Sequence, residues 1–197
     1  MANKKLFLTL SLSMGLVVIF SNYLVQFPIN YFGLENILTF GAFSYPITFL
    51  ITDLANRAYG KLKARKIVYL GFAIGVLLTL VVSTNFNDLI SIRIAIGSGI
   101  AFFVAQNLDI QIFHNLRNNK VWYIPPLASS LAGSVIDTFL FFSISFYNTG
   151  ISWITLAAGD LMVKILIALI LLIFFKFLLK KIKKISEKKI SKNYRNA

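Results

Sequence analysis

The chain has 197 residues, of which 57% are hydrophobic, and it carries a net charge of +13 with a mean hydropathy of +0.76. This composition leaves too little polar surface for a water-soluble globule, so we expect lipid to surround most of the chain. About six spans of roughly 20 residues would use nearly all of its length. The absence of Cys excludes a disulfide framework, a thiolate metal site and a cysteine nucleophile.

Apolar runs predict an all-α integral membrane protein with six transmembrane helices. The first run resembles a signal peptide, but it has no small-residue cleavage site, so we expect a retained helix. Pro46 in the second run predicts a kink. The predicted spans are at about residues 6–27, 37–56, 67–84, 92–113, 124–147 and 151–175, and a basic tail follows at 176–197.

Basic residues are concentrated in every second connection between the predicted spans. Two Lys precede the first span, five Lys or Arg lie at 57–66, two at 114–123 and nine from 176 onward, whereas the other connections have none. The positive-inside rule therefore predicts a multi-pass protein of the bacterial inner membrane with both termini in the cytoplasm. We expect the basic loops and tail to contact anionic lipid headgroups and not nucleic acid.

Ionisable residues inside the predicted spans are the main functional signal. Each charge at mid-bilayer costs about 2.5–3.5 kcal/mol even on the most lenient scale, so such residues are rare unless they serve a site. Uncharged polar residues, among them Asn22 and Gln106, accompany them. This set indicates a lined cavity. The ionisable residues are Asp53, Arg93, Asp109, Asp137, Asp160 and Lys164.

The helical rise places Asp137, Asp160 and Lys164 in the middle of the bilayer. Asp160 and Lys164 are four residues apart, the favoured spacing for an ion pair on one helix face. Asp137 has no partner so near in sequence, so its partner is another helix, a ligand or a proton. The alternative is that the Asp160–Lys164 pair only makes insertion tolerable.

Asp53 and Asp109 are expected near the cytoplasmic end of their spans, and Arg93 near the outer end. Asp53 and Arg57 again have the spacing of an ion pair. We predict that Asp53, Arg57, Arg93 and Asp109 serve gating or proton handling. Small residues such as Gly97 and Gly133 predict close contacts between helices.

The sequence has no P-loop, no H-E-x-x-H, no G-x-S-x-G and no Cys/His cluster, so we expect neither an enzyme nor a metal or other cofactor. Two alternatives stay open. One is an integral-membrane enzyme that uses Asp53 and Asp109 as a metal or acid/base pair at the cytoplasmic face. The other is a substrate-binding or assembly subunit that needs a separate ATPase.

Ordered motifs extend over almost the whole chain: SNYLVQ at 21–26, TFGAFSYP at 39–46, TDL at 52–54 followed by Arg57, AQNLD at 105–109, and a pattern from Pro126 through Gly133 to Asp137. As a set they resemble the queuosine-precursor transporter family, also called the vitamin-uptake-transporter-like family. Lys164 resembles the lysine of that family in its last span. Much of the wider family has Glu where this chain has Arg57, so no role of that Glu transfers here.

The resemblance implies uptake of 7-cyano-7-deazaguanine or its aminomethyl relative for queuosine synthesis in tRNA. It also implies a fold similar to the substrate-binding subunits of energy-coupling-factor transporters. A guanine-like edge offers N–H donors to a carboxylate and a carbonyl acceptor to an amide or ammonium. The sequence leaves open proton coupling and the oligomeric state, a homo-oligomer included. The predicted substrate-binding residues are Asn22, Gln106, Asp137, Asp160 and Lys164.

Overall fold

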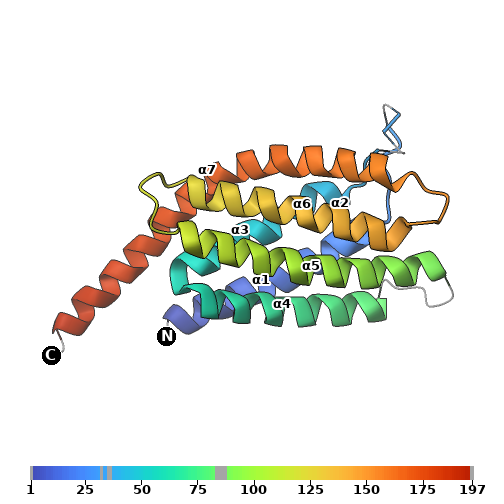
Figure 1. Cartoon of the computed structure of the whole chain (residues 1–197). Coiled ribbons are helices and arrows are strands. Elements are labelled where there is room, and N and C mark those ends of the chain that lie inside the picture. Colours follow the sequence, from blue (N-terminus) through green and yellow to red (C-terminus); the bar gives the residue numbers. More distant parts are fainter. Residues whose placement is uncertain (1, 32, 35–36, 83–87, 196–197) are drawn as a thin grey trace.

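The structure is a computed structural model that describes residues 2–31, 33–34, 37–82 and 88–195. Over these residues the chain is a bundle of α-helices, as the composition predicts (Figure 1). The helices are α1 (Ala2–Leu24), α2 (Gly41–Ser44), α3 (Pro46–Tyr59), α4 (Lys61–Val82), α5 (Leu89–Leu116), α6 (Ile124–Phe146) and α7 (Trp153–Arg195).

The long helices lie side by side, and both termini are at the same end of the bundle (Figure 1). The junction of α3 with α4 and the loop between α5 and α6 are also at this end, whereas the connections from α1 to α2 and from α6 to α7 are at the other. The segments rich in Lys and Arg therefore share one end with the termini, an arrangement that agrees with the alternation of charge in the sequence.

Four helices of the described chain are long and apolar enough to cross a membrane, judged by length and composition alone. Mostly apolar helices of this length, with exposed Leu, Ile and Phe along their outer faces, fit a multi-pass membrane protein. The predicted end of the third span, at residues 83–84, lies outside the described residues. The four helices are Lys4–Leu24, Leu89–Leu116, Ile124–Phe146 and Trp153–Lys181.

The second predicted span, 37–56, differs most from the structure. Residues 37–40 are not helical, α2 has only 4 residues and α3 has 14, about 21 Å at the rise of an α-helix. The break falls at Tyr45, because Pro46 has no N–H to continue the hydrogen bonds of α2. The kink expected from Pro46 is therefore an interruption, and it brings Tyr45 to the start of α3.

Residues 57–66 were expected to form a basic loop, but apart from Gly60 they are helical. Gly60 turns the chain from α3 into α4 with φ of 79°, a backbone conformation that glycine adopts most easily. The Lys and Arg residues from 61 to 66 consequently lie on the first two turns of α4.

The predicted tail at 176–197 also differs from a separate segment, because α7 continues without a break to Arg195. Its 43 residues make a helix about 65 Å long, roughly twice the thickness of a bilayer core. In Figure 1 the second half of α7 extends beyond the bundle at the end where both termini lie.

Small residues allow three close helix contacts. A side chain at Gly71 of α4 would collide with Met14 of α1, and one at Gly133 of α6 would lie 2.5 Å from the Phe49 ring of α3. A side chain at Gly97 of α5 would collide with Ser145 of α6. The close approach predicted for Gly97 and Gly133 is thus confirmed.

Candidate functional site

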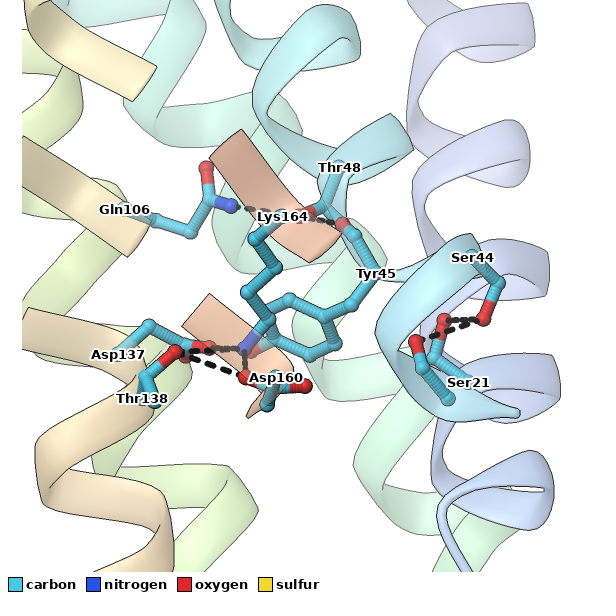
Figure 2. A network of polar contacts seen from close by, with 10 residues as sticks. Ser21, Ser44, Tyr45, Thr48, Gln106, Asp137, Thr138, Asp160 and Lys164 are labelled. Carbon is cyan, nitrogen blue, oxygen red and sulfur yellow. Dashed lines mark hydrogen bonds and ion pairs between the residues drawn. The ribbon is translucent and has the colours of Figure 1, made fainter. Parts of the chain in front are cut away.

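The central feature of the bundle is a buried ion cluster, which we call the Lys164 cluster: Asp137 and Thr138 of α6, Asp160 and Lys164 of α7, and Tyr45 before α3 (Figure 2). Lys164 Nζ lies 2.9 Å from Asp137 Oδ2 and 2.6 Å from Asp160 Oδ2. It also donates a hydrogen bond to Thr138 Oγ1 at 3.1 Å. The three charged residues are each at most 4% exposed.

The sequence left open whether Asp160 and Lys164 pair and where the partner of Asp137 lies, and this geometry shows both. The ion pair expected between Asp160 and Lys164 forms, and the partner of Asp137 lies on another helix, since it is Lys164. The Thr138 hydroxyl donates to Asp160 Oδ2 at 2.8 Å. One ammonium therefore serves two carboxylates, so the ionised cluster has a net charge of −1.

Tyr45 covers the cluster from the side of α2 and α3. Lys164 Nζ lies 4.9 Å from the centre of the Tyr45 ring, within range of a cation–π interaction. The Tyr45 hydroxyl and Asp137 Oδ1 are both buried, and neither completes a hydrogen bond. A buried carboxylate oxygen in this state is ready to accept a donor from a ligand.

A cavity adjoins the cluster between α1, α2, α5, α6 and α7, with about 330 Å³ of empty space. The space is narrow and has free room for about one water molecule, so a planar heterocycle fits only after side chains move. Polar groups and aromatic rings both face it, which is typical of a small-molecule site. The lining residues are Ser21, Asn22, Val25, Gly41, Tyr45, Ser98, Asp137, Phe141, Asp160 and Lys164.

Of the five residues predicted to bind substrate, Asn22, Asp137, Asp160 and Lys164 line this cavity and Gln106 does not. The Gln106 amide of α5 donates to Thr48 Oγ1 at 2.9 Å and accepts from the Thr52 hydroxyl of α3. Because its side chain is fully buried and these bonds use both ends of the amide, Gln106 ties α5 to α3.

Beyond the predicted site residues, the structure brings Tyr45, Thr138 and Phe141 to the cluster or its cavity. Tyr45 has a signal in the sequence, because it precedes a proline inside a span, where backbone is exposed to a cavity. Thr138 follows Asp137 directly, but its bonds to both Lys164 and Asp160 depend on the crossing of α6 over α7. Phe141, one of 19 Phe, has no such signal.

A second pair of carboxylates, Asp53 of α3 and Asp109 of α5, lies nearer the end of the bundle with the termini. Both are buried, with 1% and 0% of their surfaces exposed. The hydroxyls of Ser129 and Ser130 donate to Asp53 at 3.0 and 3.3 Å. Over the described residues, no Lys, Arg or His forms an ion pair with either carboxylate.

The prediction of an ion pair between Asp53 and Arg57 is therefore wrong. Arg57 Nη1 donates to the carbonyl of Arg117 at 2.7 Å, and Arg117 Nη2 donates to the carbonyl of Arg57 at 2.9 Å. The exchange holds the end of α3 against the end of α5. Arg57 turns toward this junction because carbonyls at helix ends lack partners within the helix.

Arg93 has a comparable role at the opposite end of the bundle. Its guanidinium donates to the carbonyl of Ile144 at 2.9 and 3.1 Å and to that of Tyr147 at 2.8 Å. These carbonyls end α6, where a cation is favoured by the helix dipole. Arg93 thus lies outside both carboxylate clusters and joins α5 to α6.

No group of three or more His, Cys, Asp or Glu side chains comes together as a metal site in the part of the chain that the structure describes. Asp53 and Asp109 are two buried carboxylates, and the serine hydroxyls that donate to this pair both bond Asp53.

Comparison with known proteins decides the family. The family model described as "Putative vitamin uptake transporter" matches residues 39–178, a range that includes every residue of the two clusters. The chain belongs to this family. The protein is therefore a membrane transporter. This result agrees with the resemblance seen in the sequence.

Three curated relatives extend the match. The "Queuosine precursor transporter" of Escherichia coli (strain K12) is 36% identical over 179 residues, which are 82% of this chain and 80% of the relative. The "Probable queuosine precursor transporter" of Haemophilus influenzae is 34% identical over 185 residues, 80% of this chain and 79% of the relative. A relative of Bacillus subtilis with the same name is 26% identical over 179 residues, 79% of this chain and 77% of the relative.

No solved structure matches the chain. The likeness to substrate-binding subunits of energy-coupling-factor transporters therefore stays a prediction.

Proposed function

We propose that this protein imports a 7-deazaguanine precursor of queuosine, 7-cyano-7-deazaguanine or its aminomethyl relative, for the modification of tRNA. The observation that carries the proposal is the Lys164 cluster, a buried set of charges that borders a cavity in the middle of a membrane bundle. The names of the E. coli and H. influenzae relatives support the class of substrate.

The chemistry of the cluster fits a guanine-like edge. Asp137 Oδ1 has no completed hydrogen bond and can accept N–H donors from the pyrimidine ring of the substrate. Lys164 can donate to the substrate carbonyl. The rings of Tyr45 and Phe141 face the same cavity and supply stacking surfaces for a flat heterocycle.

Binding requires the cluster to open. Lys164 is held by both carboxylates, and the free room beside it suits only about one water molecule. Substrate N–H groups would replace the Lys164 ammonium at Asp137, while Asp160 and Thr138 keep it paired. The protein therefore exchanges an internal ion pair for an equivalent contact with the substrate, and no charge is left alone in the membrane.

We place both termini in the cytoplasm and the protein in the bacterial inner membrane. The support is that the termini, the α3–α4 junction and the α5–α6 loop share one end of the bundle, and that these segments carry most of the Lys and Arg. The basic surface at that end would contact anionic lipid headgroups.

An uptake assay tests the function. The chain is expressed in a bacterium that cannot make 7-deazaguanines and has lost its own importer, the precursor is supplied at low concentration, and queuosine in tRNA is measured. We expect the full-length chain to restore queuosine, and Asp137→Asn and Lys164→Met to abolish the rescue. Asp88→Asn and Lys120→Met are matched controls, because both side chains are exposed.

Absence of rescue by the wild-type chain, at normal expression and insertion, would contradict the proposal. A chain that rescues only together with a co-purified ATPase would show a substrate-binding subunit of a larger importer. Uptake by purified protein in liposomes without ATP separates these two outcomes.

A further inference from the structure

We propose that Asp53 and Asp109 hold one proton between them and form a proton-binding site that couples a proton gradient to transport. The coupling to transport rests on the proposed function, whereas the binding of the proton rests on the two carboxylates alone. This site is separate from the Lys164 cluster, which has its own cation.

Asp53 and Asp109 are a buried pair of acids, almost fully inside the protein. The Asn56 amide, about one turn after Asp53, donates to the carbonyl of Ile110 at 2.9 Å, so the two carboxylates start from adjoining segments of α3 and α5. Two ionised carboxylates at such a position would be costly without a cation, and such pairs commonly share a proton. In the described chain neither has a salt-bridge partner.

The hydrogen bonds indicate which carboxylate carries the proton. Ser129 Oγ lies 3.0 Å from Asp53 Oδ1 and 3.3 Å from the carbonyl of Pro126. The hydroxyls of Ser129 and Ser130 both donate to Asp53 and so favour its ionised form. Asp109 then receives no donor, since both its oxygens are buried without a hydrogen bond. A proton on Asp109 would neutralise the carboxylate that receives no donor.

The other ionisable groups on the surrounding helices form no ion pair with Asp53 or Asp109 over the described residues. Tyr45, Asp137, Asp160 and Lys164 form the Lys164 cluster. Arg57 and Arg117 bond each other's carbonyls, and Lys61 of α4 donates to Gln111. Arg65 of α4 is partly buried and His114 of α5 is exposed, and neither pairs with Asp53 or Asp109 over the described residues.

A small pocket between α3, α6 and α7 reaches Asp53 and Ser130, and it has free room for about one water molecule beside the carboxylate. The proton would bind a carboxylate oxygen from a water molecule on one side of the membrane. It would leave to water on the other side when the conformation changes, so the carboxylate pair returns to its starting charge.

The helix α3 connects this site to the Lys164 cluster. Tyr45 at its start covers Lys164, and Asp53 follows eight residues later, about 12 Å along the helix. Between them Thr48 and Thr52 hold Gln106 of α5, one turn before Asp109. Ionisation of the pair would push α3 from α5, and a shift of α3 would move Tyr45 over the substrate cavity.

The test uses full-length protein in liposomes with a pH-sensitive dye inside and 7-cyano-7-deazaguanine outside. With an inward proton gradient, we expect the wild type to accumulate the compound and to acidify the interior when it is added. Asp109→Asn and Asp53→Asn should lower gradient-driven accumulation at least about tenfold and abolish the acidification, while exchange of internal for external compound at equal pH continues. The matched control Asp88→Asn, an exposed cap of α5, should behave as wild type.

Accumulation by Asp109→Asn equal to that of the wild type would overturn the proposal, as would accumulation driven by a sodium gradient at equal pH. If the wild type performs no exchange at all, the proposed function fails, and infrared spectroscopy of the same samples judges the proton site alone. We expect the band of a buried protonated carboxyl at neutral pH, lost in Asp109→Asn. A spectrum without that band would overturn the site.

Discussion

The two carboxylate clusters of this bundle use the same residue type in opposite ways. At the Lys164 cluster one ammonium lies within 2.9 Å of two carboxylates and a hydroxyl supports it. At Asp53 and Asp109 the described neighbours are two serine hydroxyls and no cation. A buried acid in a membrane helix thus indicates a site. The groups that surround the acid indicate what the site binds.

The first cluster can stay ionised and offers both a donor and an acceptor to a ligand in the adjoining cavity. The second can lose its charge only by taking up a proton or another cation. A transporter needs both kinds of site when a gradient drives uptake, and here a single short helix, α3, touches both.

The largest expected effect is on the charge balance of the first cluster. Lys164→Met leaves Asp137 and Asp160 buried without a cation, so the free energy of unfolding should fall by about 3–5 kcal/mol. Thermal unfolding of the purified protein in detergent measures this loss. Lys120→Met, at an exposed position, should change little.

A second change separates charge balance from ligand binding. Adding Asp160→Asn to Lys164→Met removes one of the two stranded carboxylates, so about 2 kcal/mol of the lost stability should return. Uptake should stay at background, because the donor for the substrate is still missing. Recovery of the same size when Asp88→Asn is added instead would show that the pairing of Lys164 with Asp160 contributes nothing.

The packing that brings α3 to α6 gives the next effect. Gly133→Ala places a methyl group 2.5 Å from the Phe49 ring, so we expect a loss of about 1–3 kcal/mol. Gly99→Ala is the matched control, since its new methyl group would lie 3.8 Å from Phe72 and alanine favours a helix by up to about 1 kcal/mol. Equal stability of the two variants would contradict the close contact of α3 with α6.

The smallest expected effect concerns a charge that belongs to neither cluster. Arg93→Gln removes the donors to the carbonyls of Ile144 and Tyr147 at the end of α6, at a cost of about 1 kcal/mol. The substrate concentration that gives half-maximal uptake should not change. A shift of that concentration by tenfold or more would place Arg93 in transport and not in the structure alone.

The sequence predicts well both the helical membrane class and the ionisable residues in the middle of the bilayer, for physical reasons. Apolar runs report lipid contact directly, and the spacing of four residues between Asp160 and Lys164 fixes their common helix face. The depth of Asp137 follows from helical rise, so its meeting with Lys164 needed only that α6 and α7 pack together. These properties are local or follow from one-dimensional geometry.

The rest depended on contacts between distant segments. Gln106 has the depth of a ligand-binding residue, but Thr48 and Thr52 occupy its amide, and nothing in the spacing along α5 shows this. Arg57 has the spacing of a partner for Asp53, but the open carbonyl of Arg117 at a helix end attracts it instead. The break at Pro46 was predictable, although the use of the break to bring Tyr45 over Lys164 was not.

The most direct test of the central claim is equilibrium binding of labelled 7-cyano-7-deazaguanine to the purified full-length chain in lipid nanodiscs. We predict that the wild type, Asp88→Asn and Asp109→Asn bind the compound alike, and that Asp137→Asn weakens binding at least about tenfold, or about 1.4 kcal/mol. Binding by Asp137→Asn with the affinity of the wild type, in protein of equal thermal stability, would contradict the assignment of the Lys164 cluster as the substrate site.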